Sequence, residues 1–198
     1  MNLANKLTLS RIIMIPFFLF FLMNQQGFLP FGFAAIEPYS KWIALGIFIV
    51  ASLTDMLDGK IARKYNMITN FGKFMDPLAD KLLVNLALIG LMMLGKANIW
   101  LVMLIIARDF IISGFRLVAA EKGVVIAASI WGKVKTAAQM VMVCFLIADI
   151  ERIAFVGIVL QWLVCILTLF SLIDYLVKNR NVLKDEKKED EAGTAKES

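Results

Sequence analysis

The 198-residue sequence contains no histidine, and this absence narrows the chemistry that the protein can perform. Without an imidazole, a general base has to be Asp, Glu, Lys, Tyr or Cys. Cysteine is also scarce, because only Cys144 and Cys165 are present. Both lie in apolar stretches and lack the spacing of a zinc site or of a secreted disulfide framework. The aspartates therefore become the leading candidates for catalysis and metal binding.

Charged residues are few as well. They make up 19% of the chain, against about a quarter in a typical soluble domain, while hydrophobic residues make up 60%. The mean hydropathy of +0.77 indicates a membrane protein rather than a soluble one. The length predicts one domain. We expect a lipid bilayer as the surroundings and no nucleic-acid partner.

Apolar segments near the ~20 residues that a helix needs to cross a bilayer recur along the chain. The linker 27–39 contains Pro30, Gly32 and Pro38 and therefore breaks helix. We expect an all-α, polytopic membrane protein with six transmembrane helices. These helices are predicted at approximately 8–26, 41–62, 73–95, 98–120, 130–149 and 152–177.

The placement of Lys and Arg predicts the orientation, because these residues gather on the cytoplasmic side of a membrane. If the N-terminus is inside, only Lys41, Lys96 and Arg152 of the 21 Lys and Arg residues fall outside. We therefore expect both termini in the cytoplasm, with the protein in the cell membrane and its active site facing the cytoplasm. The membrane domain is predicted over 1–178, and a charged, solvated tail over 179–198.

Four aspartates lie between two long apolar runs: Asp55, Asp58, Asp76 and Asp80. A carboxylate at membrane depth costs a few kcal/mol, so these groups need a strongly positive partner. The first two are three residues apart and the last two are four apart, so each pair shares one face of a helix. The segment 64–71 reverses the chain. Two acidic faces are therefore predicted to meet across a helical hairpin at its cytoplasmic end.

Carboxylates without His or Cys favour Mg²⁺, Mn²⁺ or Ca²⁺ over zinc. Two divalent ions about 4 Å apart would balance the charge and form a phosphoryl-transfer site. Gly59, Ala62 and Gly72 leave room where a ligand or a helix approaches, and Arg63 offers a planar fork suited to phosphate. Pro77 is tolerated if it lies in the first turn of its helix. A single Asp is more often a solvated or paired charge, but the ordered glycines favour a site.

The pattern D-x2-D-G-x2-A-R-x8-G-x3-D-x3-D resembles the signature of the CDP-alcohol phosphotransferase family. Every fixed position is matched, by Asp55, Asp58, Gly59, Ala62, Arg63, Gly72, Asp76 and Asp80. The resemblance covers about residues 1–178 and implies a CDP-linked donor whose diphosphate lies on two divalent cations, Mg²⁺ or Mn²⁺. It implies Asp55, Asp58 and Asp76 as metal ligands. It also implies that Asp80 touches the metal site and serves as the general base.

The same resemblance implies which residues contact the donor, and it implies a homodimer. Gly59, Ala62, Arg63 and Gly72 would lie along the cytidine and diphosphate. Three residues near the start, Asn5, Thr8 and Arg11, could reach the donor phosphates, but anchoring at the membrane interface explains them equally well.

The acceptor has to be predicted from the second half of the chain. The stretches 2–11, 107–123 and 127–139 are similar to bacterial family members that use glycerol 3-phosphate. Four cations in this half are predicted to bind the acceptor phosphate: Arg108, Arg116, Lys133 and Lys135. A phosphorylated acceptor needs such residues, because its dianion is held beside an anionic donor. The positive-inside rule alone would also place cations there, and Asp109 and Glu121 could pair with them.

Together these features predict transfer of a phosphatidyl group from CDP-diacylglycerol to sn-glycerol 3-phosphate, with release of CMP. A same-family synthase that acts on serine, inositol phosphate or phosphatidylglycerol is the alternative. A divalent-cation transporter would also use intramembrane carboxylates. Against a transporter, the aspartates gather at one end of the helices, and the chain has no inverted repeat or paired broken helices.

Overall fold

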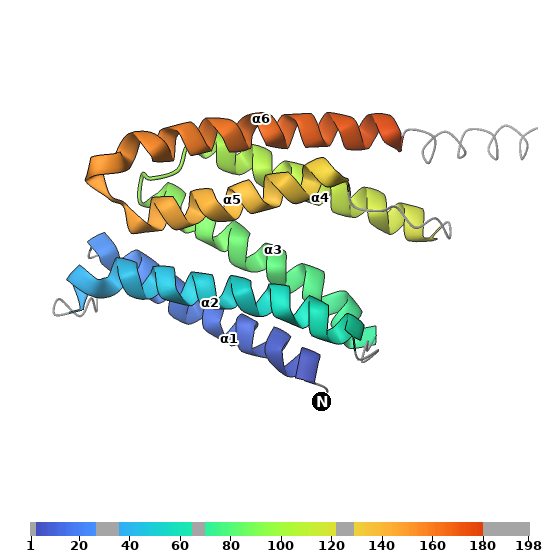
Figure 1. The fold of residues 1–198 in the computed structure, drawn as a ribbon, viewed down its shortest axis with the longest axis horizontal. Coiled ribbons are helices and arrows are strands. Elements are labelled where there is room, and N and C mark those ends of the chain that lie inside the picture. Colours follow the sequence, from blue (N-terminus) through green and yellow to red (C-terminus); the bar gives the residue numbers. More distant parts are fainter. Residues whose placement is uncertain (1–2, 27–35, 65–69, 122–128, 180–198) are drawn as a thin grey trace, which may run out of the picture. The chain divides into compact units, whose positions relative to one another are not determined.

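The structure is a computed structural model, and it describes residues 3–26, 36–64, 70–121 and 129–179. The side chains of residues 3–8, 26, 55–64, 70–80 and 121 lie outside this description. All the regular secondary structure of the described residues is helical (Figure 1). In chain order the helices are α1 (Leu3–Met23), η1 (Asn24–Gln26), α2 (Glu37–Lys64), α3 (Asn70–Met93), α4 (Ile99–Glu121), α5 (Ile130–Ala148), η2 (Glu151–Ile153) and α6 (Ala154–Lys178).

The expected all-α fold is confirmed, since α1 to α6 match the six predicted segments. Their ends differ by a few residues. The first helix begins at Leu3 rather than near residue 8, and the second extends to Lys64. The prediction counted only apolar residues that could lie in a bilayer. A helix also continues through polar residues of good helix propensity, such as Lys6 and Lys64.

The start of α3 differs from the prediction in a way that affects the aspartate motif. The helix begins at Asn70, so Gly72 lies inside it and Pro77 lies beyond the first turn. A proline at such a position removes one backbone hydrogen bond and favours a kink. The condition under which Pro77 would be tolerated, a place in the first turn, is therefore not met.

The turn between α3 and α4 falls at 95–98, as predicted. The backbone N–H of Lys96 donates to the carbonyl of Leu91 at 2.9 Å, and that of Gly95 donates to Met92 at 3.0 Å. This pair of bonds is the Schellman arrangement, which requires a left-handed residue after the helix. Gly95 supplies it with φ of 72°, a conformation that costs glycine little.

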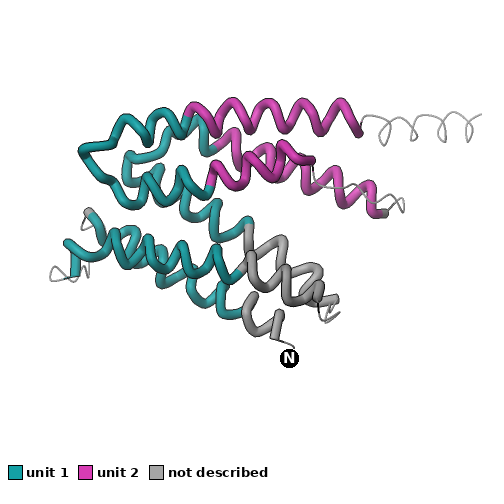
Figure 2. The backbone as a smooth tube through the Cα atoms, viewed as in Figure 1, with its two compact units in different colours: residues 1–102, 140–161 teal, residues 103–139, 162–198 magenta. Residues whose placement is uncertain are grey.

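The chain divides into two compact units (Figure 2). The first contains residues 1–102 and 140–161, and the second contains 103–139 and 162–198. In the first unit α1 packs against both α2 and α3. The rings of Phe18 and Phe48 lie 5.7 Å apart in this core, and a Cβ at Gly90 would meet Leu22 Cδ2 at 2.6 Å. The backbones of α1 and α3 therefore approach closely because residue 90 has no side chain.

Polar contacts join three connections at one end of the first unit. The Lys96 ammonium donates to Gln25 Oε1 at 2.7 Å and pairs with Asp149 Oδ2 at 2.9 Å. These residues come from the α1–α2, α3–α4 and α5–α6 connections, which therefore lie together. The end of α2 and the start of α3 lie at the other end of this unit, beside the N-terminus of α1 (Figure 1).

Two helical segments are long and apolar enough to cross a membrane, judged by length and composition among the described residues. They are Ile130–Ala148 and Glu151–Lys178. Leu9–Met23 and Lys81–Met93 are apolar but shorter. α6 exposes many large apolar side chains, including Phe155, Ile158, Trp162, Ile166 and Ile173. A row of this kind on a soluble monomer would be unusual, so the coarse expectation of a membrane protein is supported.

Candidate functional site

The aspartate motif lies on the two helix ends that the sequence predicted. Asp55 and Asp58 are in the last turns of α2, and Asp76 and Asp80 are in the first turns of α3. These two helix ends lie at the same end of the first unit (Figure 1). The four side chains lie outside the described residues, so the meeting of the carboxylates stays a prediction.

The predicted contacts with the donor also stay predictions, and among the residues concerned only Arg11 has a described side chain. The side-chain surroundings of the other predicted donor residues lie outside what the structure describes. These residues are Asn5, Thr8, Gly59, Ala62, Arg63 and Gly72. Arg11 is described, and only 1% of its surface is exposed, within the α1 that packs on α2 and α3. An anchoring arginine keeps its head group at the membrane surface. The burial of Arg11 therefore favours an interior role.

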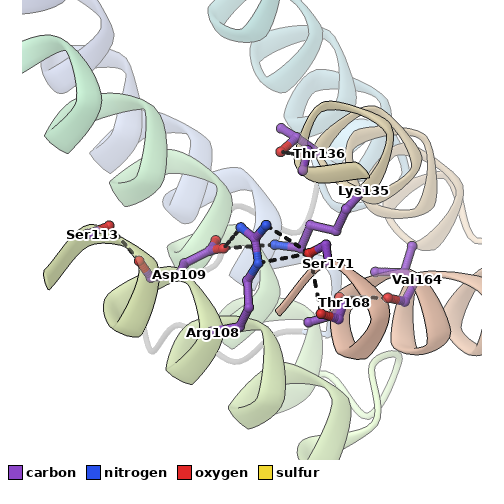
Figure 3. Close-up of polar contacts among 9 residues, drawn as sticks. Arg108, Asp109, Ser113, Lys135, Thr136, Val164, Thr168 and Ser171 are labelled. Atoms are coloured by element: carbon purple, nitrogen blue, oxygen red, sulfur yellow. Dashed lines mark hydrogen bonds and ion pairs between the residues drawn. The ribbon is translucent and has the colours of Figure 1, made fainter. Parts of the chain in front are cut away.

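The clearest polar cluster in the second unit surrounds Arg108, whose side chain is 10% exposed (Figure 3). Its Nε donates to Ser171 Oγ at 3.1 Å and its Nη2 donates to the same oxygen at 2.8 Å. Its Nη1 donates to Asp109 Oδ1 at 2.9 Å. A guanidinium has five N–H donors. One on Nη1 and one on Nη2 therefore have no partner among the described residues.

Asp109 is shared between two cations. Besides Arg108, its Oδ1 accepts a bond from Lys135 Nζ at 3.0 Å, and the Lys135 side chain is only 1% exposed. Two positive side chains thus surround one carboxylate. The prediction that Asp109 pairs with these cations is confirmed for Arg108 and Lys135. A partly buried cluster of this kind attracts anions, because charges interact more strongly away from water.

Gly132 lets α5 approach the guanidinium. A Cβ at this position would lie 3.3 Å from Arg108 Nη2. That distance is tight for an added methyl group, so any side chain here would displace the guanidinium or α5. Lys135, one turn later on α5, completes the cluster from the same helix.

The other two predicted acceptor residues do not join this cluster. The guanidinium carbon of Arg116 lies 5.9 Å from the ring centroid of Tyr175, within the range of a cation–π contact. Lys133 is exposed, and it forms no ion pair with another residue in the described part of the chain. The structure therefore brings Arg108 and Lys135 together, while Arg116 has a different partner. Roles for Arg116 and Lys133 stay predictions.

Sequence reasoning missed the contribution of α6. Ser171 meets Arg108, and Tyr175 meets Arg116. A second contact joins the start of α5 to α6, where Ser129 Oγ donates to Asp174 Oδ2 at 2.8 Å. A signal was available, because Thr168, Ser171 and Tyr175 recur every three or four residues in a mainly apolar helix. That spacing marks one polar face.

A metal site is not visible among the residues with described side chains, where no group of three or more His, Cys, Asp or Glu could hold an ion. The four motif aspartates are not among them. Their chemistry still fits a hard divalent cation, since carboxylate oxygens are the ligands that Mg²⁺ and Mn²⁺ prefer. The chain offers no histidine as a competing ligand.

The family model described as CDP-alcohol phosphatidyltransferase matches residues 1–170. A relative from Bacillus subtilis (strain 168) is named CDP-diacylglycerol–glycerol-3-phosphate 3-phosphatidyltransferase. It is 41% identical over 194 residues, which cover 92% of this chain and 97% of the relative. A relative with the same name from Salmonella typhimurium (strain LT2) is 38% identical, over 93% of this chain and 98% of its own length.

A third relative, from Mycobacterium tuberculosis (strain H37Rv), is named probable phosphatidylglycerophosphate synthase. It is 38% identical over 89% of this chain and 81% of its own length. The chain belongs to the CDP-alcohol phosphatidyltransferase family. The prediction that it is an enzyme that transfers substituted phosphate groups is thereby confirmed.

Proposed function

We propose that this chain transfers the phosphatidyl group of CDP-diacylglycerol to sn-glycerol 3-phosphate. The products are phosphatidylglycerophosphate and CMP. Two kinds of support agree. Relatives that span most of the chain are named for this reaction or its product, and every fixed position of the family signature is matched.

The observation that carries the choice of acceptor is the cluster of Arg108, Asp109 and Lys135. Two cations lie on one carboxylate, and two N–H donors of the Arg108 guanidinium have no partner among the described residues, so they remain for a ligand. A phosphate dianion accepts bidentate hydrogen bonds from arginine. A neutral acceptor such as serine would not require these residues. The arrangement thus favours a phosphorylated acceptor.

Two divalent cations, Mg²⁺ or Mn²⁺, would be held by Asp55, Asp58 and Asp76, with Asp80 in contact. When bound, they would neutralise negative charge on the diphosphate of the donor. Within the chain, the small residues Gly59, Ala62 and Gly72 leave space along the donor. Arg63 lies in the last turn of α2, where its guanidinium could pair with a phosphate.

Asp80 acts as the general base in the proposed reaction. With histidine absent, a carboxylate is the side chain suited to take the proton from the 1-hydroxyl of glycerol 3-phosphate. The oxygen then attacks the phosphorus that bears the diacylglycerol, and the bond to CMP breaks. Arg108 and Lys135 hold the acceptor phosphate and so orient its hydroxyl. This single displacement requires no covalent enzyme intermediate.

The proposed setting is the cell membrane, with six membrane-crossing helices and both termini in the cytoplasm. The grouping of three connections around Lys96 supports this topology, because the prediction places all three on the outer side. We also propose a membrane domain over 1–178, a solvated tail over 179–198, and a homodimer as in the family.

An acceptor panel tests the proposed function. Purified protein in vesicles that contain CDP-diacylglycerol is given glycerol 3-phosphate, serine, inositol phosphate or phosphatidylglycerol, and CMP release is measured. We expect CMP release with glycerol 3-phosphate, its loss on addition of a chelator, and its return with Mg²⁺ or Mn²⁺. If CMP is released only with another acceptor, the proposed reaction is wrong and the chain is a synthase of the same family that uses that acceptor. Cation uptake without CMP release would indicate a transporter.

A further inference from the structure

Both arginines of α4 are held by residues of α6 that the predicted site did not include. Arg108 bonds to Ser171, and Arg116 lies near the ring of Tyr175. Ser171 and Tyr175 are four residues apart, so they share one face of α6. We propose that this face of α6 positions Arg108 and Arg116, the two arginines predicted to bind the acceptor phosphate. The inference rests on the proposed function and adds two positioning residues to it.

Ser171 is fully buried, and its hydrogen bonds define its orientation. Its hydroxyl donates to the carbonyl of Thr168 at 3.4 Å. The lone pairs of the same oxygen therefore face Arg108 and accept from Nε and Nη2 (Figure 3). Together with Asp109 at Nη1, Ser171 holds the guanidinium from two helices. The orientation of its remaining donors is thus established before a ligand arrives.

Tyr175 holds the second arginine through its ring. The residue is 2% exposed, and Phe115 packs edge-on against it with ring centroids 6.3 Å apart and an interplanar angle of 86°. Arg116 lies 5.9 Å from the same ring. The buried Tyr175 hydroxyl has no hydrogen-bond partner among the described residues. The contact to Arg116 is therefore made by the aromatic ring, and loss of the hydroxyl would break no described hydrogen bond.

Positioning of this kind should affect acceptor binding more than chemistry. An arginine side chain has large rotamer freedom, and ordering one such side chain on binding weakens affinity by about 3- to 10-fold. Release of either arginine from α6 would add this cost to glycerol 3-phosphate binding. The donor would not be affected. A defect in folding would lower the amount of active enzyme without changing either KM.

The test measures KM for both substrates and kcat in three variants. Ser171→Ala removes the acceptor of two Arg108 bonds, and Tyr175→Leu removes the ring beside Arg116. For both we expect KM for glycerol 3-phosphate to rise about 3- to 10-fold, with KM for CDP-diacylglycerol and kcat within about twofold of wild type. Tyr175→Phe keeps the ring and should restore the wild-type acceptor KM.

Thr168→Val is the matched control, because among the described residues the Thr168 hydroxyl bonds only to the carbonyl of Val164 in its own helix. It should leave both KM values unchanged. The positioning role is overturned if Ser171→Ala and Tyr175→Leu leave the acceptor KM unchanged, or if both substrates are affected equally. Equal effects of Tyr175→Phe and Tyr175→Leu would also overturn it, because the effect would then belong to the hydroxyl.

Wild-type turnover separates this inference from the proposed function. If the wild-type enzyme uses glycerol 3-phosphate but the variants match it, only the inference fails. If the panel instead identifies another phosphorylated acceptor, the proposed function fails, and the variants test the role of α6 through the KM of that acceptor. Turnover only with acceptors that lack a phosphate would overturn both.

Discussion

The Nζ atom of Lys135 lies 3.0 Å from Oδ1 of Asp109, although the two residues belong to different helices. The same oxygen accepts a bond from Arg108. One carboxylate therefore joins α4 to α5 and separates two positive charges, which would otherwise repel each other in a site with little access to water.

Asp109→Asn should destabilise the protein by about 3 kcal/mol, because it removes the carboxylate that Arg108 and Lys135, both largely buried, contact together. Thermal unfolding in detergent measures the effect. The double variant Asp109→Asn with Lys135→Met should recover part of the loss, since only one cation then remains. An unchanged unfolding temperature in Asp109→Asn would mean that this carboxylate contributes no net stability.

Asp80→Asn should abolish turnover while metal and CDP-diacylglycerol binding are largely retained, because the amide cannot accept the proton. CMP release and donor binding are measured on the same sample. Asp149→Asn is the matched control. Asp149 pairs with the largely buried Lys96 far along the chain from the motif, and its own side chain is 55% exposed. Normal turnover in Asp80→Asn would remove the general-base role.

Lys135→Ala should raise KM for glycerol 3-phosphate about 10-fold or more, because a hydrogen bond to a charged group contributes about 1.5–3 kcal/mol. Arg116→Ala should act in the same direction. Lys133→Ala tests the fourth predicted cation. Lys133 is exposed two residues earlier on α5, so we expect a smaller rise than for Lys135→Ala. KM for the donor should stay constant in all three. If Lys133→Ala has the larger effect, the acceptor phosphate binds elsewhere on α5.

Gly132→Ala should raise the acceptor KM several-fold, because the added Cβ would lie 3.3 Å from Arg108 Nη2 and displace it. Gly114→Ala on α4 is the control, since nothing lies within 4 Å of its added Cβ. That variant should be neutral or more stable by about 0.5–1 kcal/mol, as alanine favours helix. Steady-state kinetics and thermal unfolding distinguish the two outcomes. If the two variants have the same acceptor KM and the same unfolding temperature, Gly132 is not a contact point of the guanidinium.

Much of the fold could be predicted because the apolar segments are long and the breaks between them are short. The break at 95–98 follows from the predicted helix ranges, and the positive φ of Gly95 explains the residue type there. The ends of the helices were less predictable. Apolar residues mark only the part of a helix that can lie in the bilayer. The helix α1, which begins at Leu3, and the helix α3, which begins at Asn70, extend beyond that part into polar sequence.

The parts of the candidate site whose residues lie close together in the sequence were predictable. Three or four residues between aspartates are enough to place a pair on one helix face, and the family signature depends on such spacings. The contacts of Arg108 with Ser171 and of Lys135 with Asp109 connect residues 63 and 26 positions apart. No local pattern encodes which cation meets which carboxylate across that distance.

By itself, the sequence determined the chemistry available to this protein: carboxylates without histidine, helices rich enough in apolar residues for a membrane, and a family signature on two adjacent helices. Only the tertiary structure decided that Arg108 and Lys135 share one carboxylate, while Arg116 lies beside an aromatic ring. The physical reason is that residue types and periodicity act within one helix, whereas hydrogen bonding between helices depends on which faces pack together.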